Sequence, residues 1–489
     1  MKESVACGHT LTARAAMDTF RKGGNAFDAA VAAVFASTVV EPMLTSLAGA
    51  GIGLLKNGDE TKCIDFLANF PKKGRRPPVR AVRKVVSFGD EVQEFYLGYG
   101  SLGVPGSIDG LLHIHSNYCS LELRDILAPA IQYAKGHKVS EYQATVFQIL
   151  RDYCIYTSEA REIFASRGRI PEKGETLRNP KKARFLELLG EDKKGARKFY
   201  LDEMRKVLNR HKSSLSIDDV LGYRVKEHEP IRIGYRGRKL EMASPPSAGG
   251  ILIAYGLKSI EDIDVGTLEH NSIEHVKLLA ETIKRCESKR TREFFRHLLY
   301  TTGFWKKFLK TPERLGSTTH ISVIDREGNA AGITTSNGQG AGIMIGDTGI
   351  MFNNFAAEPD LMQYKSVYKP GERITTMMSP TIISKDGEIK AVLGSGGSNR
   401  IRSAIMQVIS NMVDFGMAPR KAANSSRVHY EYGGLQLEKG IKEKAIVELE
   451  KEYKVNAWSE KNMFFGGVHI AVPGGGGGDL RRSGTVRTG

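Results

Sequence analysis

Hydroxyl-bearing residues gather at one end of a predicted β-hairpin. Side chains alternate in character over residues 319–324, a polar turn with a glycine follows, and a second β-branched run begins. If the turn is centred near Glu327, antiparallel pairing brings Thr318 opposite Ser336 or Asn337. The spacing therefore predicts a cluster of hydroxyl groups at the open end of the hairpin, where a threonine could act as a nucleophile.

A threonine hydroxyl is a poor nucleophile unless a base stands nearby. If the peptide bond between Ser317 and Thr318 is cut, Thr318 gains a free α-amine. The ordinary pKa of such an amine is about 7.7–8.0, so one residue would supply both nucleophile and base. The β-branch restricts the side-chain rotamer and helps to aim the oxygen. Taken alone, the same residues also fit an ordinary strand in which Thr318 and Thr319 have no chemical role.

The string Ser317-Thr318-Thr319-His320-Ile321-Ser322-Val323-Ile324-Asp325 resembles the processing site of the γ-glutamyltranspeptidase family, which belongs to the N-terminal nucleophile (Ntn) hydrolases. In that family the first threonine of the string is both the point of self-cleavage and the catalytic nucleophile, which implies Thr318 here. The resemblance also implies an α/β (α+β) fold, a four-layer αββα sandwich with one core built from both halves of the chain. A cut after Ser317 would separate residues 1–317 from residues 318–489 within a single folding unit.

Further matches to the family follow in the family's order along nearly the whole chain. They lie in residues 23–33, 39–42, 103–111, 242–250, 349–354, 375–382, 394–400, 464–469 and 479–484. Among them, residues 394–400 resemble a glycine-rich loop that lends main-chain N–H groups to an oxyanion hole, and by count the donors are Gly397 and Ser398. Such donors stabilise the tetrahedral intermediate and need no particular side chain. A glycine-rich turn before a helix also fits phosphate binding when taken alone, but the surrounding matches favour the oxyanion role.

The largest departure from the family lies in residues 64–71. The family has an Arg-Glu-x-Ala-Pro string there, and its arginine grips the α-carboxylate of a γ-glutamyl substrate. Aligned on Asp65 and Pro71, that arginine falls on Leu67, and leucine cannot replace a bidentate guanidinium contact. Glutathione is therefore not the expected substrate unless a nearby cation compensates. The nearby candidates are Lys72, Lys73, Arg75 and Arg76.

The other substrate contacts implied by the resemblance are Ser336, Asn337, Glu358, Thr376 and Met377. Glu358 falls where the family has an aspartate that binds the substrate's α-amino group, although an exposed loop carboxylate fits that position equally well. Thr376 and Met377 stand in place of two serines that contact the substrate carboxylate, so one hydroxyl survives. The pocket is thus predicted to be less polar than in the family.

These residues predict a self-processing amide hydrolase or acyltransferase that forms an acyl-enzyme on Thr318. We expect hydrolysis rather than transfer, since the sequence contains no recognisable acceptor site. The substrate would be a small-molecule amide, either a γ-glutamyl compound or another acidic amide, and a homo-oligomer is compatible with the pattern. Two alternatives stay open: a true γ-glutamyltransferase or glutathione hydrolase with substitute binding residues, and an uncleaved, non-catalytic member of the family.

Composition limits the remaining classes. The net charge of +16, from 71 basic and 55 acidic residues, could attract nucleic acid. Basic and acidic residues are interspersed in residues 181–212 and 277–314, and no nucleic-acid-binding motif occurs, so no specific nucleic-acid partner is expected. A basic nucleic-acid-binding protein is kept as the third alternative. The histidines and the five cysteines show no metal spacing, and no cofactor is expected.

The N-terminal residues contain no apolar leader, and no run reaches membrane-spanning length, which predicts a cytoplasmic protein without membrane contact.

The elements that must position the candidate residues follow from periodicity and turn signals. A helix ended by residues 23–25 and a second over residues 26–40 precede the first strands. Later helices are expected over residues 123–136, from Ile251 and over residues 275–290. Residues 140–225 should be mostly helical with loops at 168–177 and 190–194, and residues 230–235 should form a strand.

Overall fold

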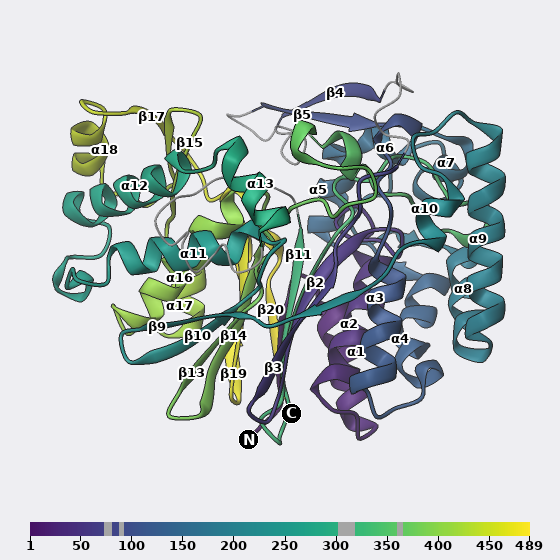
Figure 1. Ribbon diagram of the computed structural model, residues 1–489, viewed down its shortest axis with the longest axis horizontal. Coiled ribbons are helices and arrows are strands. Elements are labelled where there is room, and N and C mark those ends of the chain that lie inside the picture. Colours follow the sequence, from purple (N-terminus) through teal and green to yellow (C-terminus); the bar gives the residue numbers. More distant parts are fainter. Residues whose placement is uncertain (73–80, 88–91, 302–317, 359–364) are drawn as a thin grey trace.

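The computed structural model describes residues 1–72, 81–87, 92–301, 318–358 and 365–489. Two β-sheets lie face to face at its centre, and helices cover the outer face of each sheet (Figure 1). This arrangement is the four-layer αββα sandwich that the sequence predicts. Ser317 and part of the segment that leads to it lie outside the described residues.

The first sheet combines strands from both sides of Thr318. Its strand order is β20-β1-β11-β12-β2-β3-β8, and every pair is antiparallel. The strands are β1 (Ser4–Cys7), β2 (Ala50–Asn57), β3 (Glu60–Phe66), β8 (Lys226–His228), β11 (Thr319–Ile324), β12 (Ala330–Ser336) and β20 (Thr485–Thr488). Because β1 pairs with both β11 and β20, the two ends of the chain share one core, as expected.

The second sheet has the order β19-β18-β14-β13-β10-β9, also antiparallel. Its strands are β9 (Ile231–Tyr235), β10 (Arg238–Met242), β13 (Thr381–Lys385), β14 (Glu388–Gly396), β18 (Gly467–Val472) and β19 (Gly475–Gly477). The strand predicted over residues 230–235 is therefore confirmed as β9. Smaller sheets are formed by β15 (Val428–Glu431), β16 (Gly434–Leu437) and β17 (Lys454–Ala457), by β4 (Val82–Ser87) and β5 (Val92–Leu97), and by β6 (His137–Lys138) and β7 (Thr176–Leu177).

One helical layer covers the first sheet, on the right of Figure 1. It contains α1 (Thr10–Arg21), α2 (Ala26–Val40), α3 (Ser107–Tyr118), α4 (Leu123–Lys135), α8 (Pro180–Glu191) and α9 (Lys193–Arg210). The helix α2 has its predicted bounds because Asn25 and Asp28 form a capping box at its start. All of its residues are buried, and its many alanines allow close packing against α1, α4 and the sheet.

The same half of the chain also contains α5 (Glu141–Ile149), α6 (Arg151–Cys154), α7 (Ser158–Phe164) and α10 (Ile217–Leu221). The helical character expected for residues 140–225 is confirmed. The loop expected at 190–194 is wrong, because α8 continues to Glu191 and α9 begins at Lys193. Asp192 caps α9 by accepting a hydrogen bond from the main-chain N–H of Lys194, so one residue is enough for the change of direction.

The other helical layer covers the second sheet. It contains α11 (Ala248–Ser259), α12 (Ile273–Ser288), α13 (Arg292–Tyr300), α16 (Arg400–Val413), α17 (Pro419–Asn424) and α18 (Glu443–Leu449). The helix predicted over residues 275–290 begins two residues earlier than expected, because Ser272 caps it through a hydrogen bond from the N–H of His275.

Apolar side chains alternate between two layers of the core along the strands. In β11, Ile321 and Val323 face the helices, whereas Ile324 packs between the two sheets. His320 and Ser322 also face the second sheet, since His320 lies against Gly394 and the Ser322 hydroxyl donates to the carbonyl of His469. The end of β11 therefore lies where both sheets meet.

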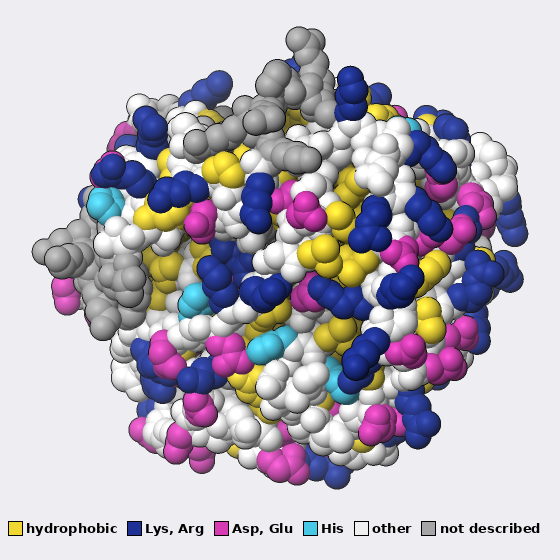
Figure 2. All heavy atoms as spheres, turned by 45° about the vertical axis from the view of Figure 1, so that its right-hand side comes forward, with side chains coloured by type: hydrophobic (Ala, Val, Ile, Leu, Met, Phe, Trp, Pro, Cys, Tyr) yellow, Lys and Arg dark blue, Asp and Glu magenta, His cyan; other side chains and the backbone are white. Residues whose placement is uncertain are grey.

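The surface mixes charges of both signs. Figure 2 shows Lys and Arg side chains interspersed with Asp and Glu over the face that it presents, without a continuous basic patch. Within the described ranges, no helix is long and apolar enough to cross a membrane.

Candidate active site

Thr318 lies directly before β11, at the open end of the predicted hairpin. Thr319 pairs with Thr335, so the next position along places Thr318 opposite Ser336, which confirms the expected register. Thr318 is only 1% exposed, and its Oγ1 atom has no hydrogen-bond partner among the described residues. A buried hydroxyl without a partner is costly unless something else binds it. Because Ser317 lies outside the described residues, cleavage between Ser317 and Thr318 stays a prediction.

The predicted oxyanion turn lies between β14 and α16, directly against Thr318. A Cβ atom placed on Gly396 would lie 1.8 Å from the carbonyl oxygen of Thr318, so only glycine fits there. Gly397 and Ser398 follow with φ angles of 123° and 59°, and Asn399 returns to a right-handed conformation. A left-handed residue followed by a right-handed one turns successive N–H groups toward one concavity, which suits an anion. This geometry supports Gly397 and Ser398 as oxyanion donors.

A buried amide side chain, that of Asn337, directly follows the second strand of the hairpin. Both polar atoms of the Asn337 side chain lack hydrogen-bond partners among the described residues, although the side chain is fully buried. The neighbouring Ser336 hydroxyl accepts a hydrogen bond of 2.9 Å from the N–H of Gly338. The amide of Asn337 is therefore a candidate to bind a polar group of a substrate.

The other predicted substrate contacts differ in their surroundings. Glu358 is 1% exposed, so it is not an exposed loop carboxylate; a Cβ atom on Gly338 would lie 3.2 Å from its Oε2 atom, which places it beside the hairpin end. The Thr376 hydroxyl accepts a hydrogen bond from the N–H of Met378 at 3.1 Å. The Met377 side chain is fully buried in the core between the second sheet and its helices, so only its main chain is available to a substrate.

Leu67 packs between the two sheets rather than at the edge of an open pocket. It is 1% exposed and belongs to an apolar cluster that includes Ile52 and Met378. The nearby Asp65 is bound by Arg373, whose Nε atom lies 3.0 and 2.9 Å from the two carboxylate oxygens. Burial opposes ionisation of Asp65, yet the charge of Arg373 lowers its pKa. The Nε atom of Arg373 is therefore engaged by Asp65.

Of the four cations named as candidates to compensate for Leu67, the structure describes only Lys72. Lys72 is exposed, its N–H donates to Asp219, and its side chain passes Gly371. The other three candidates, Lys73, Arg75 and Arg76, lie outside the described residues.

Arg482 is a cation at the site that sequence reasoning missed. Its Nη1 atom donates to the carbonyl oxygen of Thr318 at 3.4 Å and its Nη2 atom to that of Met463 at 3.3 Å. No carboxylate of the described residues forms an ion pair with it. Only a weak signal in the sequence could have identified Arg482. This residue lies in residues 479–484, which match the family, but no feature of that string predicts a contact with Thr318.

Glu41 was also missed, although Glu41-Pro42 forms part of another family-like string. It is 4% exposed and accepts hydrogen bonds of 3.2 Å from the hydroxyls of Thr319 and Thr12. Burial raises the pKa of Glu41 to about 7, although the two hydroxyls and Arg482 act in the opposite direction. A titratable carboxyl therefore contacts the residue next to the candidate nucleophile.

The histidine after the two threonines is not placed to act as a base. Its Nδ1 atom lies 2.7 Å from the Thr334 hydroxyl and its Nε2 atom 2.8 Å from the Ser322 hydroxyl, so both ring nitrogens of His320 are engaged. Burial lowers the pKa of His320 well below 6.5. The α-amine of a cleaved Thr318 is therefore the better candidate for the base.

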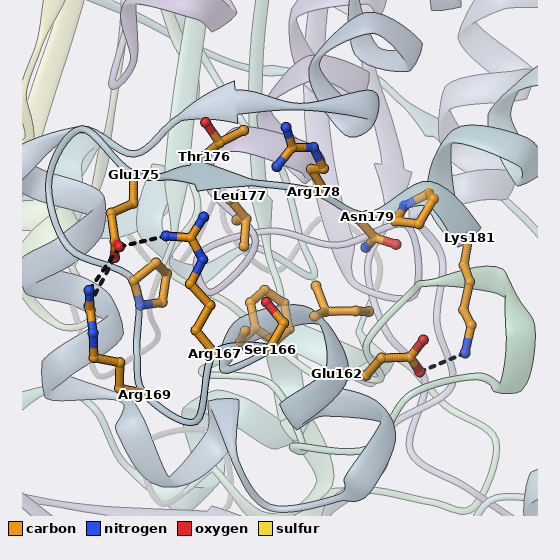
Figure 3. A pocket seen from close by; sticks show the side chains of 14 residues that line it. Glu162, Ser166, Arg167, Arg169, Glu175, Thr176, Leu177, Arg178, Asn179 and Lys181 are labelled. Carbon is orange, nitrogen blue, oxygen red and sulfur yellow. Dashed lines mark hydrogen bonds and ion pairs between the residues drawn. The ribbon is translucent and has the colours of Figure 1, made fainter.

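Other parts of the structure offer less for catalysis. A polar pocket beside α7 and the start of α8 is lined by opposite charges that pair with each other, Arg169 with Glu175 at 2.8 Å and Lys181 with Glu162 at 2.9 Å (Figure 3). None of the predicted site residues lines it. Over the described part of the chain, no group of three or more His, Cys, Asp and Glu side chains is placed to hold a metal ion.

Comparison with known proteins identifies a family for the whole sequence. The sequence matches the gamma-glutamyltranspeptidase family over residues 12–296 and 297–487. It is 28% identical to the glutathione hydrolase proenzyme of Escherichia coli (strain K12), over 91% of this chain and 84% of that protein. It is also 28% identical to the acylase ACY 1 proenzyme of Pseudomonas sp. (strain SE83), over 90% of this chain and 84% of that protein. The fold is similar to that of the cephalosporin acylase from Bacillus halodurans, with a TM-score of 0.80 at 22% identity, covering 99% of this chain and 95% of that one.

Proposed function

The chain belongs to the γ-glutamyltranspeptidase family, a family of hydrolases and acyltransferases, and we propose that it is a self-processing amide hydrolase with Thr318 as its nucleophile. The observation that carries this proposal is the position of Thr318, a buried hydroxyl without a described partner, held opposite Ser336 and against the Gly396–Ser398 turn.

Self-processing would come first. The proposed cut between Ser317 and Thr318 leaves regions of 317 and 172 residues, 1–317 and 318–489, that stay together because their strands share both sheets. It frees the α-amine of Thr318, which then serves as the base.

Catalysis would follow in balanced steps. The α-amine takes the hydroxyl proton while Oγ1 of Thr318 attacks the amide carbonyl, and the N–H groups of Gly397 and Ser398 stabilise the resulting oxyanion. The tetrahedral intermediate collapses as the ammonium returns a proton to the leaving nitrogen, so an amine departs and an ester on Thr318 remains. Water, deprotonated by the same α-amine, attacks the ester carbonyl; the bond to Oγ1 then breaks, the ammonium returns the proton to Oγ1, and the acid leaves with the free Thr318 restored. Hydrolysis is favoured over transfer because no acceptor site was recognised.

The substrate is proposed to be a small-molecule amide other than glutathione. Leu67, which the resemblance aligns with the family's carboxylate-binding arginine, lies within the inter-sheet core, and Met377 is also packed in the core. A cytoplasmic location is part of the same proposal, and assembly into a homo-oligomer stays a prediction.

A second candidate is a γ-glutamyl hydrolase or transferase with substitute binding groups. It is favoured by Glu358, a buried carboxylate beside the hairpin end, at a position suited to the α-ammonium of a γ-glutamyl group.

The first experiment is denaturing electrophoresis with intact-mass measurement of the wild type beside Thr318→Ala. We expect the wild type to give two fragments, one that ends at Ser317 and one that begins at Thr318. The variant should stay whole. The cleaved protein is then assayed on a panel of amides that includes γ-glutamyl compounds. A wild type that stays whole after long incubation would support the uncleaved, non-catalytic alternative instead.

A further inference from the structure

A small apolar pocket opens beside the oxyanion turn. Its volume is about 50 Å³, whereas a single water needs roughly 10–15 Å³, so it has room for a few carbon atoms. Most of its wall is apolar and comes from the loop after α2, from α5 and from the segment before β18. The apolar side chains include Met43, Leu44, Val146, Ile149, Leu150 and Phe464.

Two segments next to Thr318 contribute to the wall of the pocket. Gly397 and Ser398, the proposed oxyanion donors, line one side of it. Gly338 and Gln339 line another side, and they follow Ser336, which lies opposite Thr318. If the N–H groups of this turn polarise the carbonyl group of an amide substrate, one substituent of that amide therefore lies next to the pocket.

The charges around the pocket do not suit an amino-acid head group. No carboxylate of the described residues lines it, and Glu358, which lies beside Gly338, is not part of its wall, so the wall itself offers no anion to an α-ammonium. One of its two cations, Arg400, stacks on the ring of Phe464 at 4.2 Å and lies 3.6 Å from Glu431. The other, Arg482, donates to the main-chain carbonyl groups of Thr318 and Met463.

We propose that this pocket binds a short apolar substituent of the amide substrate, an aliphatic chain of a few carbons, and that the site prefers it to a γ-glutamyl head. The proposal rests on the proposed amidase function and specifies its substrate class. It follows from burial of apolar surface, because each methylene that leaves water strengthens binding.

The test uses two series of amides on the cleaved wild-type protein. In the first, acetyl, butyryl and hexanoyl groups are joined to one leaving amine, 4-nitroaniline, with γ-glutamyl-4-nitroanilide beside them. In the second, acetamides carry methyl, butyl and hexyl groups on nitrogen. We expect kcat/KM to rise about fourfold per methylene in one series, the factor that corresponds to about 0.8 kcal/mol. The series in which kcat/KM rises shows whether the acyl group or the group on nitrogen occupies the pocket. No rise in either series, or a preference for the γ-glutamyl compound, would overturn the proposal.

A charge placed in the pocket checks its location. Ile149 is partly exposed at the end of α5, so Ile149→Asp is compatible with folding. We expect the loss of kcat/KM to grow with chain length and to reach about 10- to 100-fold for the longest chain, since a carboxylate opposes burial of methylenes. Gln148→Asp, on the exposed face of the same helix, is the matched control and should leave the series unchanged. Equal losses for all chain lengths would argue against the pocket.

Binding separates a failure of this proposal from a failure of the amidase function. If the protein hydrolyses no amide, the amidase function fails, and calorimetry with hexanamide and with glutamine, both primary amides, still tests the pocket. Tighter binding of hexanamide that Ile149→Asp removes would support it. Tighter binding of glutamine, or no binding of hexanamide, would contradict it.

Discussion

The Thr319 hydroxyl donates a hydrogen bond of 3.2 Å to Oε1 of Glu41, the residue directly after α2. This contact joins the first helical layer to the residue that follows the candidate nucleophile. A second hydroxyl, from Thr12 of α1, donates to the other carboxyl oxygen. Because the carboxyl is buried, it keeps its proton to a higher pH than an exposed glutamate does.

Replacement of this carboxyl should change how stability depends on pH. Burial raises the pKa of Glu41 from 4.5 to about 7, so the folded protein binds more protons than the unfolded chain between these values. The contribution of Glu41 is therefore fully present below pH 4.5 and is lost as pH rises to 7. The difference in free energy of unfolding between wild type and Glu41→Gln should fall by about 3 kcal/mol over this range.

Urea denaturation at a series of pH values measures that difference. Subtraction of the two curves removes the contribution of the histidines, which titrate in both proteins. Glu122→Gln, which removes an exposed carboxyl group, is the control. Parallel curves for wild type and Glu41→Gln would show that Glu41 titrates as an ordinary carboxyl.

Gly396→Ala should abolish function at the junction of the two sheets. The added Cβ atom would lie 1.8 Å from the carbonyl oxygen of Thr318, so Thr318 or the turn must move. A displacement of about 1 Å can lower a rate about 100-fold, and we expect at least that loss in self-cleavage and in amide hydrolysis.

The control for Gly396→Ala is Gly234→Ala in β9, where an added Cβ meets no atom within 4 Å. Circular dichroism shows whether each variant folds. A folded Gly396→Ala protein with wild-type self-cleavage would mean that Thr318 does not lie against this turn during the reaction.

Arg482→Met should shift the pH dependence of hydrolysis. The guanidinium lies 3.4 Å from the carbonyl oxygen of Thr318, and a positive charge so close disfavours protonation of the α-amine on the same residue. Without it, we expect the acid limb of the kcat/KM profile to move to higher pH by up to about one unit. Activity would then fall more at pH 6 than at pH 9. Arg482→Lys keeps the positive charge and should keep the wild-type pH profile. An unchanged profile in Arg482→Met would show that the charge of Arg482 does not affect the α-amine.

Leu67→Arg should destabilise the protein rather than create γ-glutamyl specificity. The Leu67 side chain is buried between the sheets, so the new guanidinium would lose its hydration without a carboxylate partner. We expect a loss of about 3 kcal/mol or more in the free energy of unfolding. Leu67→Met, which conserves volume, should cost less than about 1.5 kcal/mol. A stable Leu67→Arg protein that hydrolyses γ-glutamyl amides would show instead that this position faces the substrate.

Local patterns predicted much of the scaffold and part of the site. The hairpin register that sets Thr318 opposite Ser336 follows from alternation and a central turn, and the bounds of α2 follow from a capping box and a run of alanines. Both depend on residues close together in the chain, so their physical causes are visible in the sequence. The glycines around Gly397 could be identified for the same reason, since a tight turn between a strand and a helix needs them.

The sequence by itself determined the family, because short strings of residues resemble the family's motifs in the same order, and that resemblance implied the layered fold and the candidate nucleophile. Only the tertiary structure decided what surrounds that nucleophile. Glu41 and Thr319 are 278 residues apart in the sequence, and Arg482 and Thr318 are 164 apart. No local pattern of residues predicts such contacts. Tertiary packing also placed Leu67 inside the core. The burial of a side chain and the charges next to it depend on how distant segments pack. Burial and neighbouring charges in turn set the shape of the proposed substrate pocket and the pKa values of the groups beside it.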